Sequence, residues 1–147
     1  MMKIISNNKK ASYEYFLLEK YEAGIVLTGT EIKSIRQGKC NIEDSYINIG
    51  GNTAIIIGMN IPKFDNGNIN NHEEKRPRNL LLHKKEMLKI SQKVKEEGLT
   101  IIPTKLYLDD RGRAKLEIAL SKGKKKYDKR ESIKEREVNR KIQRGEY

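Results

Sequence analysis

The sequence predicts a mainly β protein with helices: an OB-type antiparallel β-barrel with flanking α-helices and a basic C-terminal tail. Several short segments alternate apolar and polar residues and are separated by turns that contain Gly or Asn. One longer segment has the apolar period of a helix. The last residues are dense in charge and almost without large apolar side chains. Small barrels of this kind often bind nucleic acid. We expect the barrel over residues 1–121 and the tail over residues 122–147.

The first predicted elements are strands followed by a short helix. Residues 13–28 are rich in aromatic and aliphatic side chains, and Gly24 interrupts them where a bend or bulge would lie, so we expect a pair of strands. In the helix that follows, Thr30 can act as the N-cap. Glu31 lies in the first turn, where the helix dipole favours a carboxylate, and Gly38 can end the helix.

The middle of the chain predicts a hairpin and then a loop. The stretch SYINIGGNTAIIIGMNIPKF indicates two or three short strands, with a turn at Gly50, Gly51 and Asn52. Residues 65–79 have no apolar period, and we expect a loop there.

The clearest helix lies over residues 83–98, where Gly98 can end it. Its predicted buried stripe consists of Met87, Ile90, Ser91 and Val94. Residues 99–121 predict a β-hairpin with its turn at residues 110–112, because apolar and charged side chains alternate after the turn. Pro103 suits the start or the edge of a strand.

Charge predicts the class of partner. The formal net charge is +11, and residues 122–147 carry more than half of it, with eleven Lys and Arg against five Asp and Glu. A small domain this basic is expected to meet nucleic acid first and an anionic membrane surface second. The tail has too few aliphatic side chains to anchor it on a barrel, so we expect it to be disordered when free.

No pattern in the sequence predicts catalysis, a metal site or a cofactor. Cys40 is the only cysteine, and His72 and His83 lie too far apart for a metal motif. A buried, structural Cys40 is favoured over a nucleophile. Glu43 and Asp44 fit a metal pair, or equally an acidic entry to a strand. No apolar run reaches the roughly 18 residues that span a bilayer, and the N-terminus lacks a signal-peptide pattern, so we expect a cytoplasmic protein without membrane contact.

Three blocks in this order, YEAGIVLTGTEIKSIRQGKCNIEDSYINI, RPRNLLLHKKE and KGKKKYDKRESIKERE, strongly resemble the SmpB family, the SsrA-binding proteins of bacteria. The resemblance runs from about residue 13 to the end of the chain and leaves residues 65–74 unmatched. Three ordered blocks over this length are a specific signal, whereas the lysine-rich block alone would be weak.

The resemblance implies a non-enzymatic OB-type protein that binds the tRNA-like domain of transfer-messenger RNA. Such a protein escorts that RNA into the vacant A site of stalled ribosomes, with elongation factor Tu as a further partner in delivery. Its tail enters the empty mRNA channel past the decoding centre of the 16S rRNA and becomes helical. Peptide tagging and ribosome release follow. No cofactor is implied, and we expect a monomer. The alternative is a general OB-fold RNA-binding or ribosomal protein whose tail is only electrostatic.

The resemblance also implies RNA-binding residues in the barrel. Glu22 matches a family carboxylate, which can act as a double acceptor for base-edge donors on an unpaired loop. Without the resemblance, a solvated Glu22 or an ion pair with Lys20 would be favoured. Tyr21 can stack on a base or serve as a core aromatic, and both remain open.

Cations near the two helices are predicted to contact phosphates, and solvated cations are the alternative. The residues are Lys33, Arg36, Arg76 and Arg78. Leu81 and His83 match family positions implicated in RNA binding, and His83 lies where helix N–H groups favour anions. The family often has a basic residue where this chain has Asn79.

In the tail, Asp128 can act as an N-cap with Glu131 three residues later, which predicts the start of a helix. Arginines four residues apart would repel each other in water, so we expect the helix to form against phosphates. Gly123 is the predicted hinge, and Tyr127 is the predicted stacking residue. The predicted ribosome-binding residues are Gly123, Lys124, Lys125, Tyr127, Asp128, Lys129, Arg130, Lys134, Arg136 and Arg140.

Overall fold

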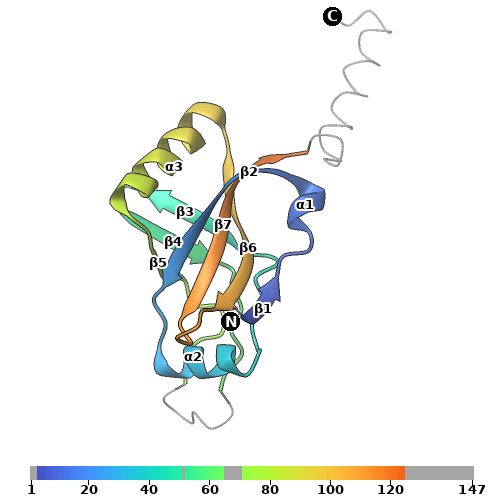
Figure 1. Ribbon diagram of the computed structural model, residues 1–147, viewed down its shortest axis with the longest axis vertical. Helices are drawn as coiled ribbons and strands as arrows, with labels where there is room; N and C mark the ends of the chain where they lie inside the picture. Colours follow the sequence, from blue (N-terminus) through green and yellow to red (C-terminus); the bar gives the residue numbers. More distant parts are fainter. Residues whose placement is uncertain (1–2, 51, 65–70, 125–147) are drawn as a thin grey trace, which may run out of the picture.

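The computed structural model describes residues 3–50, 52–64 and 71–124, and this part of the chain is mainly β sheet with three helices (Figure 1). The elements are β1 (Lys3–Asn7), α1 (Ala11–Glu14), β2 (Tyr15–Ile25), α2 (Gly29–Arg36), β3 (Tyr46–Gly50), β4 (Thr53–Ile57), β5 (Arg78–Leu81), α3 (Lys84–Glu97), β6 (Thr100–Leu108) and β7 (Ala114–Gly123).

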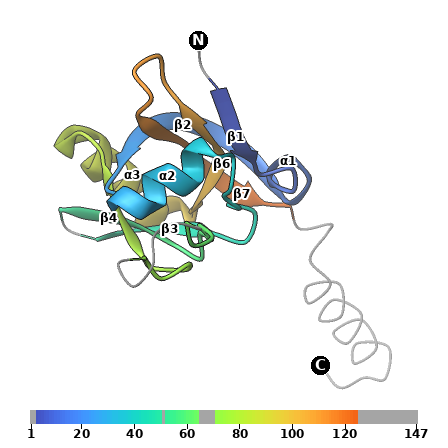
Figure 2. The same cartoon turned by 90° about the horizontal axis from the view of Figure 1, so that it is seen from below.

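All described strands belong to one antiparallel sheet in the order β1-β6-β3-β4-β5-β2-β7. Because β6 also pairs with β7, six of the strands follow one another in a closed ring, and β1 joins β6 from outside. The β3–β6 pairing is short, and Ile47 lies opposite Ile101 in it. Seen from below, α2 crosses one end of this ring, while α3 lies beside β3 (Figure 2).

The core lies inside the ring, and alternation along the strands places it there. In β7, Leu116, Ile118 and Leu120 are buried while Lys115 and Glu117 are partly exposed, as the sequence predicted. Buried aliphatic side chains from strands β2 to β6 and from helices α2 and α3 complete one cluster. One contiguous core is what a chain of this length is expected to form.

The predicted pair of strands before residue 28 is wrong, because β2 is one continuous strand. Its bulge lies between Leu17 and Glu19, not at Gly24. Gly24 pairs with Leu81 of β5, and a Cβ built on Gly24 would lie 3.3 Å from the Cβ of Leu81. The glycine therefore permits a close approach of two strands and does not mark a break.

The predicted N-cap of the short helix, α2, is also wrong by two residues. Thr28 caps α2 in a capping box, in which its side chain accepts from the N–H of Glu31 and the Glu31 carboxylate accepts from the N–H of Thr28. The hydroxyl oxygen Oγ1 of Thr30 instead lies 2.8 Å from Nδ1 of His72. Gly38 follows the helix with a φ of +80°, which suits a glycine.

Several other boundaries agree with the sequence. The β3–β4 and β6–β7 hairpins form as predicted, and α3 begins after His83 and ends at Gly98, which has a φ of +64°. The predicted loop over residues 65–79 is wrong at its end, because Arg78 and Asn79 begin β5. The prediction that Pro103 lies at the start or the edge of a strand is wrong, because Pro103 lies inside β6, which pairs with β1, β3 and β7. It lies at a register shift of β6, where a proline is tolerated. The sequence did not predict β1 and α1.

Leu116→Ala tests the position of the core. Leu116 is fully buried in β7, so the truncation should lower the free energy of unfolding by roughly 2–5 kcal/mol, measured by urea denaturation. Leu88→Ala is the matched control, because Leu88 is 51% exposed on α3 and should cost no more than about 0.5 kcal/mol. Equal losses for both variants would contradict this arrangement of the core.

Candidate nucleic-acid interface

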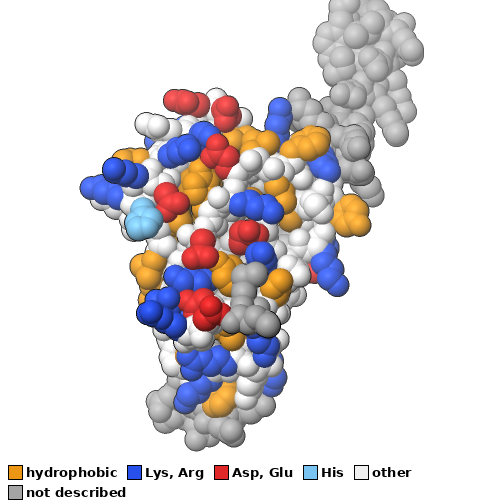
Figure 3. Space-filling model, viewed as in Figure 1, with side chains coloured by type: hydrophobic (Ala, Val, Ile, Leu, Met, Phe, Trp, Pro, Cys, Tyr) orange, Lys and Arg blue, Asp and Glu red, His pale blue; other side chains and the backbone are white. Residues whose placement is uncertain are grey.

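One surface joins apolar side chains to cations at the end of the molecule that carries α2. It surrounds a shallow pocket of about 410 Å³. We call it the Leu81 surface, and its residues are Gly24, Ile25, Leu27, Ile32, Arg36, Leu81, Gly112, Arg113, Ala114 and Lys115. In Figure 3 blue side chains gather near this end, and most red side chains lie around the middle and toward the opposite end of the same face. Apolar area for bases beside cations for phosphates is typical of RNA-binding surfaces.

The strands determine how the Leu81 surface is built. Leu81 is 62% exposed because β5 alternates, with Arg78 and Leu80 inward and Asn79 and Leu81 outward. Arg36 from α2 donates from Nη2 to the carbonyl of Gly112 at 3.3 Å, which ties the helix to the β6–β7 turn. Three separate elements thereby meet at one surface.

Glu22 lies on the outward face of β2, two residues before Gly24. The hydroxyl of Tyr107 on β6 donates a hydrogen bond to Oε2 of Glu22. Burial raises the pKa of Tyr107, and the bond to Glu22 raises it further, so the hydroxyl remains a donor at neutral pH. Tyr107 is thus the partner of Glu22 in the described part of the chain, and Lys20 is not.

Tyr21 points to the opposite face of β2 and packs against the core. Its hydroxyl donates to Oε2 of Glu19 at 2.5 Å, and Glu19 also pairs with Lys93 of α3. Burial, together with the bond to Glu19, raises the pKa of Tyr21 to about 12. The hydrogen bonds from Lys93 and Tyr21 lower the pKa of Glu19 to about 2. This placement favours the core alternative for Tyr21 over base stacking.

Arg78 does not lie at the surface, and this corrects the predicted phosphate contact. Its side chain is fully buried and pairs with the buried carboxylate of Glu31. Arg78 also donates to the carbonyls of Met59 at 2.8 Å, Glu73 at 3.3 Å and Glu74 at 3.2 Å. Four of the five N–H donors of this guanidinium are bonded inside the protein, so it stabilises the fold, and its full burial keeps it from a phosphate.

Arg76 is intermediate between a buried side chain that stabilises the fold and an exposed cation that can contact phosphate. Its Nη2 lies 2.6 Å from Oε1 of Glu31, and 35% of its side chain remains exposed. Burial raises the pKa of Glu31, but the hydrogen bonds from Arg76, the Thr28 N–H and Arg78 outweigh it and hold the pKa below its ordinary value. Burial lowers the pKa of Arg78, and the pair with Glu31 opposes that effect.

The remaining predicted barrel cations are exposed. Lys33 and Arg36 lie on the outer side of α2, and Nζ of Lys33 is 5.5 Å from the ring centre of Phe64. His83 is exposed at the N-cap of α3, and its side chain makes no capping hydrogen bond. Contacts of these residues with phosphate remain predictions.

The root of the tail is part of the fold. Gly123, the predicted hinge, pairs with Tyr15 at the end of β7. Lys124 donates from its backbone N–H to the carbonyl of Glu14 at 3.0 Å and from Nζ to the carbonyl of Ser12 at 2.8 Å. The other predicted tail residues lie outside the described residues; these are Lys125, Tyr127, Asp128, Lys129, Arg130, Lys134, Arg136 and Arg140.

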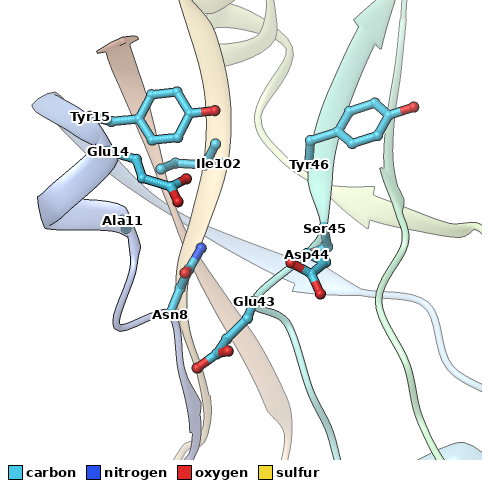
Figure 4. Close-up of a pocket in the computed structure, with 9 residues that line it drawn as sticks. All are labelled: Asn8, Ala11, Glu14, Tyr15, Glu43, Asp44, Ser45, Tyr46 and Ile102. Carbon is cyan, nitrogen blue, oxygen red and sulfur yellow. The ribbon is translucent and has the colours of Figure 1, made fainter. Parts of the chain in front are cut away.

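A second pocket, of about 240 Å³, lies between α1 and the start of β3 (Figure 4). Its carboxylates come from Glu14, Glu43 and Asp44, so its charge opposes a phosphate backbone. In the described part of the chain, no group of three or more His, Cys, Asp or Glu side chains could hold a metal ion. No helix described here is long and apolar enough to cross a membrane.

Cys40 is a poor nucleophile in this structure. Burial raises the pKa of its thiol to about 12, so the thiolate is absent at neutral pH.

The sequence did not point to Tyr107, Arg113 or Lys115 as candidate site residues. The only signal for the last two was their position beside a predicted turn, and nothing in the sequence placed Tyr107 beside Glu22.

Comparisons with known proteins agree on one family. The family model described as "SmpB protein" matches residues 5–146. The chain is 57% identical over 141 residues to the SsrA-binding protein of Thermosipho melanesiensis, covering 96% of both chains. It is 49% identical over 144 residues to the SsrA-binding protein of Moorella thermoacetica, covering 98% of this chain and 93% of that one.

A solved structure is similar as well. It is described as "tmRNA-SmpB: a journey to the center of the bacterial ribosome", and the matching chain has a TM-score of 0.69 and 40% sequence identity. The match covers 84% of this chain and 86% of that chain.

Glu31→Gln tests the buried ion pair. Removing the carboxylate charge leaves Arg78 buried without its counter-ion, so the free energy of unfolding should fall by roughly 3–5 kcal/mol in urea denaturation. Glu14→Gln is the matched control, because Glu14 is exposed and should change stability by no more than about 0.5 kcal/mol.

The pH dependence of stability gives a second measurement on the same variants. Because the folded pKa of Glu31 lies below the ordinary 4.5, its stabilising contribution is complete above that pH and is lost as the pH falls through the folded pKa. Glu31→Gln should therefore lose less stability than the wild type on acidification below pH 4.5. Identical acid profiles for Glu31→Gln and the wild type would contradict the lowered pKa.

Proposed function

This chain belongs to the SmpB family, and we propose that it binds the tRNA-like domain of transfer-messenger RNA (SsrA) and delivers it to the vacant A site of stalled ribosomes for trans-translation. The observation that carries the proposal is the match to SsrA-binding proteins over nearly the whole chain. The similarity to a chain from a tmRNA-SmpB structure on the bacterial ribosome supports it.

The geometry supports an RNA partner independently of the family. The net charge of +11 favours a polyanion, and the Leu81 surface brings exposed apolar area together with Arg36, Arg113 and Lys115. Glu22 lies on the same outward face, where a carboxylate can accept from base edges of an unpaired loop. In this proposal the closed ring of strands is an OB-type barrel with flanking helices, which presents the RNA-binding face.

In this proposal the tail contacts the ribosome, and elongation factor Tu helps to deliver the RNA. The barrel domain holds the transfer-messenger RNA, and residues 125–147 reach the decoding centre of the 16S rRNA and the empty mRNA channel. Elongation factor Tu takes part in the delivery complex. The protein acts as a monomer in the cytoplasm, without a catalytic step of its own. The alternative is a general OB-fold RNA-binding or ribosomal protein, for which the tail only adds positive charge.

Removing residues 125–147 separates these two functions. The cut falls after Lys124 because Gly123 and Lys124 are bonded to β2 and α1 and belong to the folded domain. The truncated protein should bind the tRNA-like domain within about threefold of the full chain but should not support peptide tagging in a reconstituted translation assay on stalled ribosomes. Loss of RNA affinity in proportion to the charge removed would favour the alternative.

A triple alanine variant of Asp128, Lys129 and Arg130 is the control for charge, because it removes a net charge of only +1. Tagging should fall while the affinity for the tRNA-like domain stays unchanged. Normal tagging by this variant would show that the first part of the tail has no specific role.

The phosphate contacts of the barrel can be counted by salt dependence. Lys115→Gln should reduce the slope of log K against log salt by about 1 for the tRNA-like domain, because each phosphate contact releases about one counter-ion. Lys95→Gln is the matched control, since Lys95 is exposed near the end of α3, away from the Leu81 surface. An unchanged slope for Lys115→Gln would remove Lys115 from the interface.

A further inference from the structure

Two carboxylates face each other on the sheet. In the β2–β7 register Glu22 is directly opposite Glu117. Like charges in directly opposite positions destabilise a strand pair. Each of these carboxylates, however, accepts a hydrogen bond from a hydroxyl on β6, the strand that pairs with the other edge of β7.

The two donors are Tyr107 and Thr104. Tyr107 donates to Oε2 of Glu22, and Thr104 donates from Oγ1 to Oε2 of Glu117 at 2.5 Å. A hydroxyl that donates to an ionised carboxylate forms one of the stronger hydrogen bonds in proteins. Strand β6 therefore orients both side chains and offsets part of their mutual repulsion.

Tyr107 is suited to hold another side chain in place. It is only 7% exposed, so its ring is fixed by the protein around it. Glu22, by contrast, is exposed at the end of a flexible side chain. In the part of the chain that the structure describes, the Glu22 side chain makes no other hydrogen bond or ion pair. Its Oε2 is therefore held, and its Oε1 remains as an acceptor on the outward face.

We propose that Tyr107 is a positioning residue for RNA recognition: its hydroxyl fixes the Glu22 carboxylate so that Oε1 accepts from an N–H donor on the edge of an unpaired base. This inference rests on the proposed function. A carboxylate close to phosphates is repelled unless it accepts such a donor, so its orientation decides whether it helps or hinders binding. Tyr107 has its effect through Glu22 and does not touch the RNA.

A double-mutant cycle tests the proposal with the full chain and the tRNA-like domain of transfer-messenger RNA as the probe. The proteins are wild type, Tyr107→Phe, Glu22→Ala and the double variant. Tyr107→Phe keeps the buried ring and removes only the donor, so it should weaken binding about 3- to 10-fold, the size expected for the net contribution of one ordinary hydrogen bond. In the Glu22→Ala background the same change should alter Kd by less than about twofold, because the group it positions is absent.

Two further readouts separate positioning from a structural role. The salt slope should stay the same in Tyr107→Phe, because no phosphate contact is lost. Tyr46→Phe is the matched control; Tyr46 is 49% exposed on β3, beside the acidic pocket, and losing its hydroxyl should leave Kd unchanged. An equal loss of affinity from Tyr107→Phe in both backgrounds, or no loss at all, would overturn the proposal. A loss of RNA affinity in Tyr107→Phe that is accompanied by a fall in Tm would also overturn the proposal, because it would indicate a structural role.

The failure of the proposal and the failure of the proposed function give different results. If the wild-type chain does not bind the tRNA-like domain, the proposed function is wrong. If the wild type binds and Glu22→Ala binds equally well, the function stands, but Glu22 reads no base and Tyr107 has nothing to position.

Discussion

The buried ion pair between Glu31 and Arg78 is the interaction on which the rest of the structure depends. Both side chains are fully buried, and they join α2 to the first residue of β5. The same guanidinium bonds the carbonyl of Met59 and the carbonyls of Glu73 and Glu74. One cation thus holds a helix, a strand and two connecting segments together where α2 crosses the end of the ring of strands.

This constraint also determines the functional surface. Because side chains alternate along β5, an inward Arg78 places Leu81 on the outer face. Gly24 on β2 allows β5 to approach closely at that point, and Arg36 of α2 ties the β6–β7 turn to the same place. The interface that we propose for RNA is therefore a consequence of internal packing. A cation near an RNA-binding surface need not itself bind RNA, and Arg78 is the example in this chain.

The sequence predicted what depends on local pattern. The α3 helix, the β6–β7 hairpin and the alternating core residues of β7 follow from periodicity and turn residues, and the structure has them. Prediction from the sequence failed where tertiary contacts determine the local structure. The sequence around Gly24 fits a bend in the strand and a close approach of a second strand equally well. The contact with Leu81 of β5 shows that the close approach is the reason for the glycine. Thr28 and Thr30 are both acceptable N-caps, and the contact with His72 engages Thr30.

The candidate site shows the same division. Family resemblance pointed to Glu22 and Leu81, and both lie on outward faces. Charge and position pointed to Arg78 as a phosphate contact, and that prediction is wrong because Arg78 is buried. The spacing between Glu22 and Tyr107 along the chain is 85 residues, so no local pattern predicts their hydrogen bond. Such partners are found only when the strand order and register are known.

Hydroxyl-radical footprinting of the chain, free and bound to the tRNA-like domain, tests the central claim most directly. Leu81 is 62% exposed in the free protein and should react readily there. Upon RNA binding, Leu81 should be protected, while Tyr46 and Leu88 on other faces should react as before. Protection of Tyr46 or Leu88 with unchanged reactivity at Leu81 would contradict the account.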